Sequence, residues 1–257
     1  MMDPPPAPAA SDLFQGPRGE KTFGGDLGLC RGPSFTPAEV RRIAELIKTH
    51  MIGVAREVSP DAVAELDASD LERFHQVRGY DHPRMLSKRG RILDEAAMRE
   101  IKAMSFFDYV REGFGAFCLA DEDDIGHEQI TFRLVRPEQA DDVGSLHCDA
   151  WFWDALETPL PAGLNRTKVW AGVCVQPALN GLRLAPGSHR RAAPYHVDRS
   201  GAKLTFVPDF DIDQIGLRQY GGQPGEPILF NYRTLHVGSF NRADVCRVSI
   251  ETTILYR

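Results

Sequence analysis

The 257-residue sequence has no apolar run long enough to cross a membrane. A membrane helix needs about 20 consecutive apolar residues, and the longest uninterrupted apolar run here is Val169–Val175. The N-terminus also lacks the basic start and apolar stretch of a signal peptide. We therefore expect a protein that does not enter a membrane.

A surplus of basic residues is also missing. Acidic residues number 36 and basic residues 30, which gives a formal net charge of −6. Nucleic-acid-binding domains usually carry a basic surplus, so we expect no nucleic-acid partner, although a local basic pocket for an acidic ligand stays open. No GxGxxG or GxxxxGK[ST] loop is present either, so nothing supports nucleotide binding at a helix N-terminus.

Cysteine is scarce, and its positions show no paired motif. The five cysteines are odd in number and form no CxxC motif, which argues against a disulfide framework or a zinc knuckle. Their simplest interpretation is that of small buried apolar residues in a reducing cytosol, so we predict a cytoplasmic location.

The chain changes character along its length. Residues 1–33 are rich in proline and glycine and are expected to form mostly a flexible tail, with docking of a part on the domain left open because Phe14, Phe23, Leu27 and Leu29 are apolar. Residues 34–118 carry helix signals: a capping box from Thr36 to Glu39, a second start at Ser59-Pro60, and a third helix over about 94–112. Residues 119–257 instead contain short β-rich runs separated by Gly, Pro and Asn, which indicate a sandwich or barrel such as a jelly roll. These runs are Ile130–Val135, Lys168–Gln176, Leu204–Val207, Pro227–Asn231 and Arg247–Leu255.

The motif His147-Cys148-Asp149 is the first sign of chemistry. On a strand, residues i and i+2 point to the same face, so the imidazole and the carboxylate would lie side by side. A further histidine would complete a 2-His-1-carboxylate facial triad, the pattern of non-heme Fe(II) oxygenases. Among the eight histidines, His236 follows an apolar strand and a short polar turn and leads into a second strand, which makes it a candidate for the third ligand, whereas His189 lies in a polar segment after Pro186-Gly187-Ser188.

Arg247 and Ser249 form a second i, i+2 pair. An arginine fork with a neighbouring hydroxyl suits a buried carboxylate, which the guanidinium can bind through two parallel hydrogen bonds. The alternative is an exposed polar edge of a strand, because charged residues are mostly exposed.

Together these pieces resemble the phytanoyl-CoA dioxygenase-like family of Fe(II)/2-oxoglutarate-dependent oxygenases. The resemblance extends over about residues 129–255, and the first 120 residues match only loosely as helical covering. The matching segments are His147-x-Asp149, Asn180–His189, Gly225–Phe230, His236–Ser239, and Asn241 with Arg247 and Ser249.

The resemblance implies a fold of class α+β, mainly β. Its core would be a double-stranded β-helix (a jelly roll, cupin-like) with N-terminal helices packed on it, in a single domain over 34–257.

The resemblance also implies that His147, Asp149 and His236 hold Fe(II), and that Arg247 with Ser249 binds the far carboxylate of 2-oxoglutarate. The implied reaction is hydroxylation of an unactivated C–H bond of a small organic molecule by O2, with release of succinate and CO2. Ascorbate is a possible reductant in vitro. Since related halogenases replace the carboxylate ligand by Gly or Ala, Asp149 disfavours halogenation.

The resemblance, together with position in the sequence, suggests further pocket residues. The strand beginning at Lys168 lines the co-substrate pocket in related enzymes, and alternation puts Trp170 on the same face as Lys168. For the substrate we predict contacts from residues that flank the HxD motif or precede His236. A competing interpretation places the aromatics in the core and pairs the arginines with Asp141 and Asp142. The predicted substrate contacts are Arg133, Arg136, Trp151, Trp153, Tyr232 and Arg233.

Other functions stay open at this stage. The same cofactors could tailor a sugar-linked or natural-product substrate, including by desaturation or epimerisation. A jelly-roll binding protein without catalysis is disfavoured by the complete triad and the Arg/Ser pair. A metal-dependent isomerase of cupin type is disfavoured because cupin sites usually use more histidine ligands. The sequence does not indicate the substrate or the oligomeric state.

Overall fold

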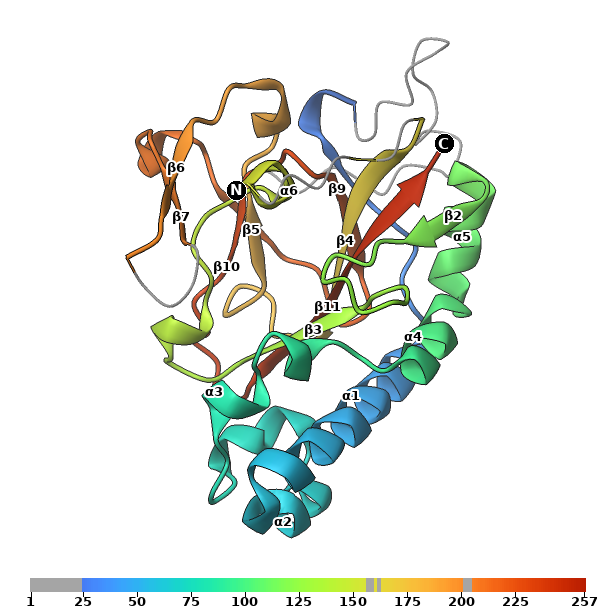
Figure 1. Ribbon diagram of the computed structural model, residues 1–257, viewed down its shortest axis with the longest axis vertical. Coiled ribbons are helices and arrows are strands. Elements are labelled where there is room, and N and C mark those ends of the chain that lie inside the picture. The colour runs from blue at the N-terminus through green and yellow to red at the C-terminus, as the bar shows by residue number, and fades with distance from the viewer. Residues whose placement is uncertain (1–24, 156–159, 161–162, 201–204) are drawn as a thin grey trace.

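The computed structural model describes residues 25–155, 160, 163–200 and 205–257, and combines helices with antiparallel sheets (Figure 1). The helices are α1 (Pro37–Val58), α2 (Val63–Ala68), α3 (His82–Met85), α4 (Glu95–Lys102), α5 (Ser105–Phe114) and α6 (Asp149–Ala155). The strands are β1 (Leu29–Arg31), β2 (Phe117–Leu119), β3 (Thr131–Val135), β4 (Asn165–Cys174), β5 (Leu182–Leu184), β6 (Tyr195–Asp198), β7 (Thr205–Pro208), β8 (Arg218–Tyr220), β9 (Pro227–Asn231), β10 (His236–Gly238) and β11 (Arg247–Tyr256). None of the described helices is long and apolar enough to cross a membrane.

The larger sheet has the order β1-β9-β4-β11-β2, and β3 also pairs with β11. Its two long strands, β4 and β11, lie antiparallel, with Glu251 opposite Trp170 and Thr253 opposite Lys168. A smaller sheet has the order β10-β5-β8, and β6 and β7 form a separate hairpin. The sequence predicted the strands β3, β4, β7, β9 and β11 and a strand led by His236, which is β10, and it missed β1, β2, β5, β6 and β8.

One face of the larger sheet is apolar and covered by helices. Val169 of β4 and Val248, Ile250 and Ile254 of β11 pack into one cluster with buried residues of α1, α4 and α5. Figure 1 shows these three helices on the same side of the sheet. The every-second-residue apolar pattern of β11 is therefore explained by helix packing.

The opposite face turns toward the smaller sheet. Trp170, Ile228 and Phe230 of the larger sheet pack against Leu182, Leu184 and Tyr220 of the smaller one. This second apolar cluster holds the two sheets together, and the polar residues beside it lie in the space that remains between them.

The N-terminal helix signals are confirmed, with one correction. Thr36 accepts a hydrogen bond from the Glu39 amide, and the Glu39 carboxylate accepts one from the Thr36 amide, as in a capping box. The predicted third helix is instead two, α4 and α5, because the chain turns at Ala103 and Met104.

The predicted flexible tail is only partly described. Residues 1–24 lie outside the described part of the chain. Within residues 25–33 the chain docks on the domain rather than forming a flexible tail, because Leu29–Arg31 form an edge strand paired with β9 and Cys30 is buried. Gly32 packs so closely on Phe106 that a Cβ atom there would lie 2.7 Å from its ring. Backbone pairing and packing thus outweigh the Pro/Gly-rich composition of the segment.

Candidate metal centre and cavity

Two predicted metal ligands meet across a single backbone bridge. The His147 amide donates to the His236 carbonyl over 3.1 Å, and the His236 amide donates to the His147 carbonyl over 2.8 Å. The ring centroids lie 4.4 Å apart. The bridge thus brings together two imidazoles that are distant in the sequence.

Each imidazole is oriented by its own chain. His147 Nδ1 lies 2.7 Å from the Ser145 carbonyl oxygen, and His236 Nδ1 lies 2.9 Å from that of Thr234. A carbonyl can only accept a hydrogen bond, so Nδ1 carries the proton in both rings. The Nε2 lone pair is then available to a metal, and the carbonyl contact fixes the ring, as is usual for metal-binding histidines.

Asp149 reaches the same point from a helix. The predicted strand through His147 and Asp149 is wrong, because Asp149 is the first residue of α6. The helix forms because Ala150 and Trp151 are buried together in a cluster with Phe206, which a strand of alternating residues would not allow. The Asp149 carboxylate is buried, and its Oδ2 has no hydrogen-bond partner among the described residues.

The three side chains form one cluster. Each of His147, Asp149 and His236 offers a ligand atom within 4.8 Å of the other two. Asp149 Oδ2 lies 4.0 Å from His236 Nε2. Two imidazole Nε2 atoms and a buried carboxylate oxygen with no hydrogen-bond partner among the described residues fit a divalent transition metal in a facial arrangement.

Electrostatics favours the metal-binding protonation states. Burial and the neighbouring His236 lower the pKa of His147 to about 4, so this ring is neutral at pH 7. Burial opposes the ionisation of Asp149, but the Lys168 ammonium and the two imidazoles outweigh it and hold the pKa of the carboxyl below its usual value. Both groups are therefore ready to bind a cation.

Lys168 lies directly beside this cluster. Its Nζ is 3.6 Å from Asp149 Oδ1 and 3.3 Å from Glu122 Oε2, and the side chain is buried. Burial disfavours the ammonium, but Asp149, Glu122 and Glu251 outweigh it and raise the pKa of Lys168. The lysine remains charged and balances the carboxylates on this side of the cavity.

Arg247 and Ser249 are buried at the start of β11, so the interpretation as an exposed strand edge is wrong. Arg247 Nη1 donates to the Gly181 carbonyl, and its Nε has no partner among the described residues. No described carboxylate forms an ion pair with this guanidinium. A Cβ atom on Gly238 would lie 3.2 Å from Arg247 Nη1, and Gly238 is two residues beyond His236 on β10.

The Arg247 charge is poorly compensated. Burial and repulsion from Arg133 lower its pKa to about 10, against the attraction of Glu251. A guanidinium buried in this way, with an unused nitrogen, fits a carboxylate ligand.

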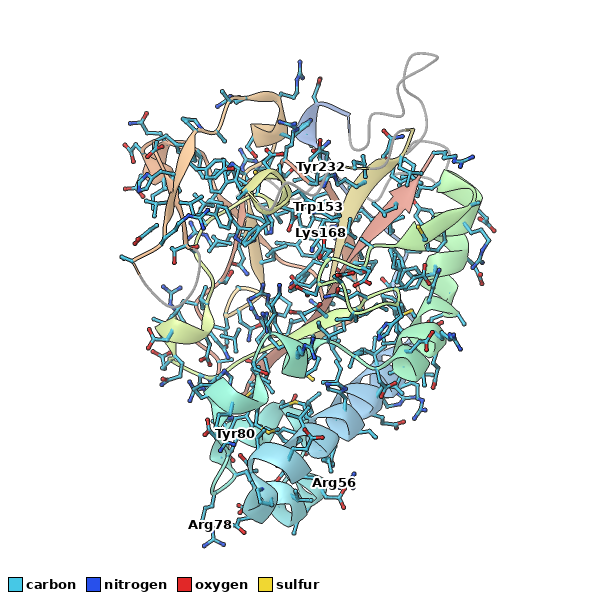
Figure 2. The ribbon with its side chains drawn as sticks, in the orientation of Figure 1. Arg56, Arg78, Tyr80, Trp153, Lys168 and Tyr232 are labelled. Carbon is cyan, nitrogen blue, oxygen red and sulfur yellow. The ribbon has the colours of Figure 1, made fainter. Side chains whose placement is uncertain are left out.

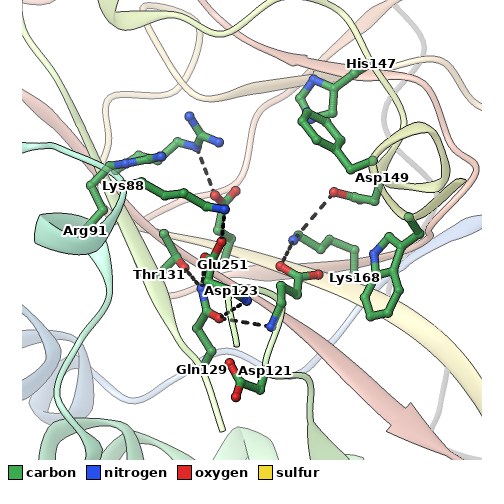
Figure 3. A pocket seen from close by; sticks show the side chains of 14 residues that line it. Lys88, Arg91, Asp121, Asp123, Gln129, Thr131, His147, Asp149, Lys168 and Glu251 are labelled. Carbon is green, nitrogen blue, oxygen red and sulfur yellow. Dashed lines mark hydrogen bonds and ion pairs between the residues drawn. The ribbon is translucent and has the colours of Figure 1, made fainter. Parts of the chain in front are cut away.

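A cavity of about 230 Å³ opens beside the metal ligands (Figure 3). Of the residues predicted from the sequence, it contains His147, Asp149, Lys168, Arg133 and Trp153. The rest of its lining is mostly charged or polar, with Phe152 beside Trp153 as an aromatic wall. These further lining residues are Lys88, Arg91, Asp121, Glu122, Asp123, Gln129, Thr131, Phe152 and Glu251.

Four predicted substrate contacts do not line this cavity. Arg136 pairs with Asp142, its Nε 2.9 Å and its Nη2 2.8 Å from that carboxylate. Trp151 is buried and stacks on Tyr195 at 4.7 Å between ring centroids. Arg233 lies over the ring of Tyr232, and neither residue lines the cavity. The Arg166 guanidinium lies 4.5 Å from the Tyr232 ring centroid and 4.1 Å from that of Trp153, so Tyr232 is next to the wall but not part of it (Figure 2).

Trp170 is also outside the cavity. It is buried between the two sheets, with its ring centroid 6.1 Å from that of Tyr220. The side chain is part of the core because the two sheets pack on each other here, and the sequence pattern does not reveal this packing.

Two important lining residues were missed. Glu251 continues the alternation of Arg247 and Ser249, so strand parity could have identified it. Arg91 lies in a 3₁₀ turn (Arg89–Arg91) in the helical half, where no motif signals it.

Comparison with known proteins finds similar folds among solved structures. No protein-family model matches the chain, and neither does any curated protein. Among solved structures, EctD from S. alaskensis with 2-oxoglutarate and 5-hydroxyectoine matches with a TM-score of 0.57 at 16% identity, covering 89% of this chain and 72% of that one. The apo form of the non-heme monooxygenase ThoJ matches with a TM-score of 0.56 at 15% identity, covering 90% of this chain and 75% of that one.

The chain has the fold of ThoJ and EctD. At this level of identity the likeness concerns the fold, and the predicted family resemblance is confirmed to that extent. A second ThoJ structure, its nickel complex, matches with a TM-score of 0.52 at 15% identity. The chemistry must therefore be argued from the residues of this chain.

Proposed function

We propose that the protein is a non-heme Fe(II)- and 2-oxoglutarate-dependent dioxygenase that hydroxylates a C–H bond of a small molecule, with release of succinate and CO2. The observation that carries the proposal is the convergence of His147, Asp149 and His236, with both histidine Nε2 atoms and one carboxylate oxygen free to bind. The fold shared with a non-heme monooxygenase supports it.

We further propose that residues 34–257 form one domain whose core is a double-stranded β-helix. Two antiparallel sheets packed through a common apolar cluster support this architecture. Free cysteines, three of them buried, support the proposed cytoplasmic location.

In this proposal His147, Asp149 and His236 hold Fe(II) on one side and leave the other side open. When bound, the iron with 2-oxoglutarate and O2 supplies the oxidising chemistry, and the protein supplies orientation and exclusion of water. Lys168 stays charged and holds the Asp149 carboxylate through Oδ1. Oδ2, which has no partner among the described residues, is left for the metal.

Arg247 and Ser249 are the proposed contacts for the far carboxylate of 2-oxoglutarate. The carboxylate would use the unpaired Nε of Arg247 and compensate its buried charge. Two residues of strand span about 6–7 Å, so Gly238, beside Arg247, lies close to the metal ligand His236 on β10. Lys168 and Trp170, on the same face of β4, are proposed as further walls of the co-substrate pocket.

For the substrate, Arg133 and Trp153 remain proposed contacts because they line the cavity. The intramolecular pairing of Arg136 and the burial of Trp151 remove support for those two residues as contacts. Tyr232 and Arg233 lack support for the same reason, since they contact each other outside the lining.

The test is anaerobic addition of Fe(II) and 2-oxoglutarate to the full chain. We expect a weak visible charge-transfer band in the wild type, no band in His236→Ala, and an unchanged band in His196→Ala. His196 is a matched control, since it is exposed and pairs with Asp209 far from the triad. Absence of a band in the wild type would contradict the proposal and favour a binding protein.

A second comparison separates metal from co-substrate. Arg247→Ala should bind one equivalent of metal but lose most of its affinity for 2-oxoglutarate, whereas the exposed Arg242→Ala should retain both. Equal 2-oxoglutarate affinity in both variants would rule out the proposed role of Arg247.

A further inference from the structure

The cationic side chains of the cavity beside the proposed metal ligands differ in how they are paired. Four cationic side chains line it: Lys88, Arg91, Arg133 and Lys168. Three of them have acidic partners. Lys88 pairs with Asp123, Arg133 Nε lies 2.9 Å from Glu251 Oε1, and Lys168 contacts Glu122 and Asp149.

Arg91 is different. Among the residues that the structure describes, none accepts a hydrogen bond from its guanidinium, and none forms an ion pair with it. The side chain is partly buried, and burial together with repulsion from Arg133 lowers its pKa despite the attraction of Glu251 and Asp123. Its charge is thus under-compensated in the free protein.

The acidic residues around the cavity already contact other groups, and Glu251 pairs with Arg133 through Oε1. Glu122 accepts from Lys168 and from Thr253 Oγ1, and Asp123 accepts from Lys88 and Gln129. Asp121 accepts the backbone N–H groups of Ile125 and Gly126. None of these contacts reaches Arg91, so among the described residues its guanidinium is left for a ligand.

The remaining wall is aromatic and adjoins the metal ligands. Phe152 is 37% exposed, and its ring lies edge-on to His147 with 5.2 Å between centroids. The ring of Trp153 is held from one side by the Arg166 guanidinium, 4.1 Å from its centroid. Figure 3 shows Arg91, His147, Asp149 and Lys168 around the same space.

We propose that the substrate is a small monoanion, in which a carboxylate or similar oxyanion binds Arg91 and an apolar body packs on Phe152 and Trp153. This inference rests on the proposed function and specifies its substrate class. The anionic end is anchored on the helical side of the cavity, and the apolar end is held beside His147. A C–H bond near the apolar end is then the one presented to the metal centre.

The test uses matched probes on the full chain loaded with Ni(II) and saturating 2-oxoglutarate, which keeps the Arg247 site filled. The probes are 3-phenylpropanoate, 3-phenylpropanamide and 3-phenylpropylamine, with indole-3-acetate and indole-3-acetamide as a second set. Ligand-observed NMR titration gives the affinities. Ni(II) and 2-oxoglutarate binding are measured first, so a failure of the proposed function is seen before any probe is added.

We expect at least one acid to bind about tenfold or more tightly than its amide and the amine, because hydrogen bonds to a charged group are the stronger ones. Arg91→Gln should weaken binding of that acid about tenfold or more and leave the amide unchanged. Arg91→Lys should retain part of the affinity. Arg89→Gln is the matched control, since Arg89 is exposed in the same turn and does not line the cavity.

Several results would overturn the inference. These are no binding of either acid at about 10 mM, equal affinity for acid and amide, or no effect of Arg91→Gln. A loss of 2-oxoglutarate affinity in Arg91→Gln would instead assign this arginine to the co-substrate and also overturn the inference. If Ni(II) and 2-oxoglutarate themselves do not bind, the proposed function fails and this inference fails with it.

Discussion

The two faces of the larger sheet are built from the same strands but differ in composition: one is apolar and packed against helices, and the other carries charged side chains beside the cavity. Along β11, Val248, Ile250 and Ile254 pack against helices, whereas Arg247 and Glu251 carry buried or half-buried charges toward the cavity side. The helix-covered face is optimised for stability through close packing. The cavity face keeps groups that lack partners in the free protein, which is a sign of binding rather than of packing.

The largest expected effect is on the helix-covered face. Phe132→Ala removes a fully buried ring from β3 and should lower the free energy of unfolding by about 3–5 kcal/mol. Phe152→Ala, on the cavity wall, should cost about 1 kcal/mol or less because the ring is already part-exposed. Urea unfolding of both variants measures the difference, and equal losses would refute the contrast between the two faces.

On the cavity face, function should change more than stability. Arg247→Met removes a buried cation with an unused nitrogen, so unfolding should change by no more than about 1 kcal/mol. Affinity for 2-oxoglutarate should fall about 100-fold, or about 2.7 kcal/mol. Calorimetric titration and urea unfolding test both parts, with the exposed Arg242→Met as control. A strongly destabilised variant would show that Arg247 is structural.

Glu251 makes the cavity face sensitive to acid. Burial disfavours its ionised form, but Arg133, Lys168 and Arg91 outweigh it and hold the pKa well below the usual value of 4.5. Because the folded-state pKa is depressed, the stabilisation is present above pH 4.5 and is lost as the pH falls toward the folded-state value. Glu251→Gln should therefore cost about 1–3 kcal/mol at pH 7 and less in acid.

Unfolding curves from pH 7 to 3 test this difference. Glu45→Gln serves as the control, since Glu45 is 63% exposed in its ion pair with Arg42 and should change stability little at any pH. A Glu251→Gln difference that stays constant with pH would contradict the pairing.

The smallest effect is at the start of the covering helix. Thr36→Ala removes the cap of α1 and should lower stability by about 1 kcal/mol. Thr36→Ser should recover most of it, and neither variant should alter metal or 2-oxoglutarate binding. Changed binding in Thr36→Ala would show that the helices and the cavity are coupled.

Local rules predicted the helix-covered half of the molecule well. The capping box at Thr36 and the alternation in β11 depend on neighbours in sequence, so they could be read directly. The three-residue strands β5 and β8 could not, because they are stabilised by pairing with distant segments.

The identities of the proposed metal-binding residues could be predicted from the sequence, but the elements that carry them could be predicted only in part. His147, Asp149 and His236 converge, but Asp149 does so from a helix that tertiary packing of Trp151 imposes. Arg91 could not be found, since its place in the cavity depends on how the helical half folds over the sheet. The ion pair between Arg136 and Asp142 was one of the interpretations left open.

The bridge between His147 and His236 also bears on when the metal centre forms. It closes a loop of roughly 90 residues, whose entropic cost is about 4 kcal/mol and must be met by packing elsewhere. Contacts of such long range belong to the slow part of folding. The three side chains therefore converge after the sheets have paired, so in the proposed function the folded protein rather than the nascent chain would select the ion, and a bound ion would stabilise the folded chain by mass action.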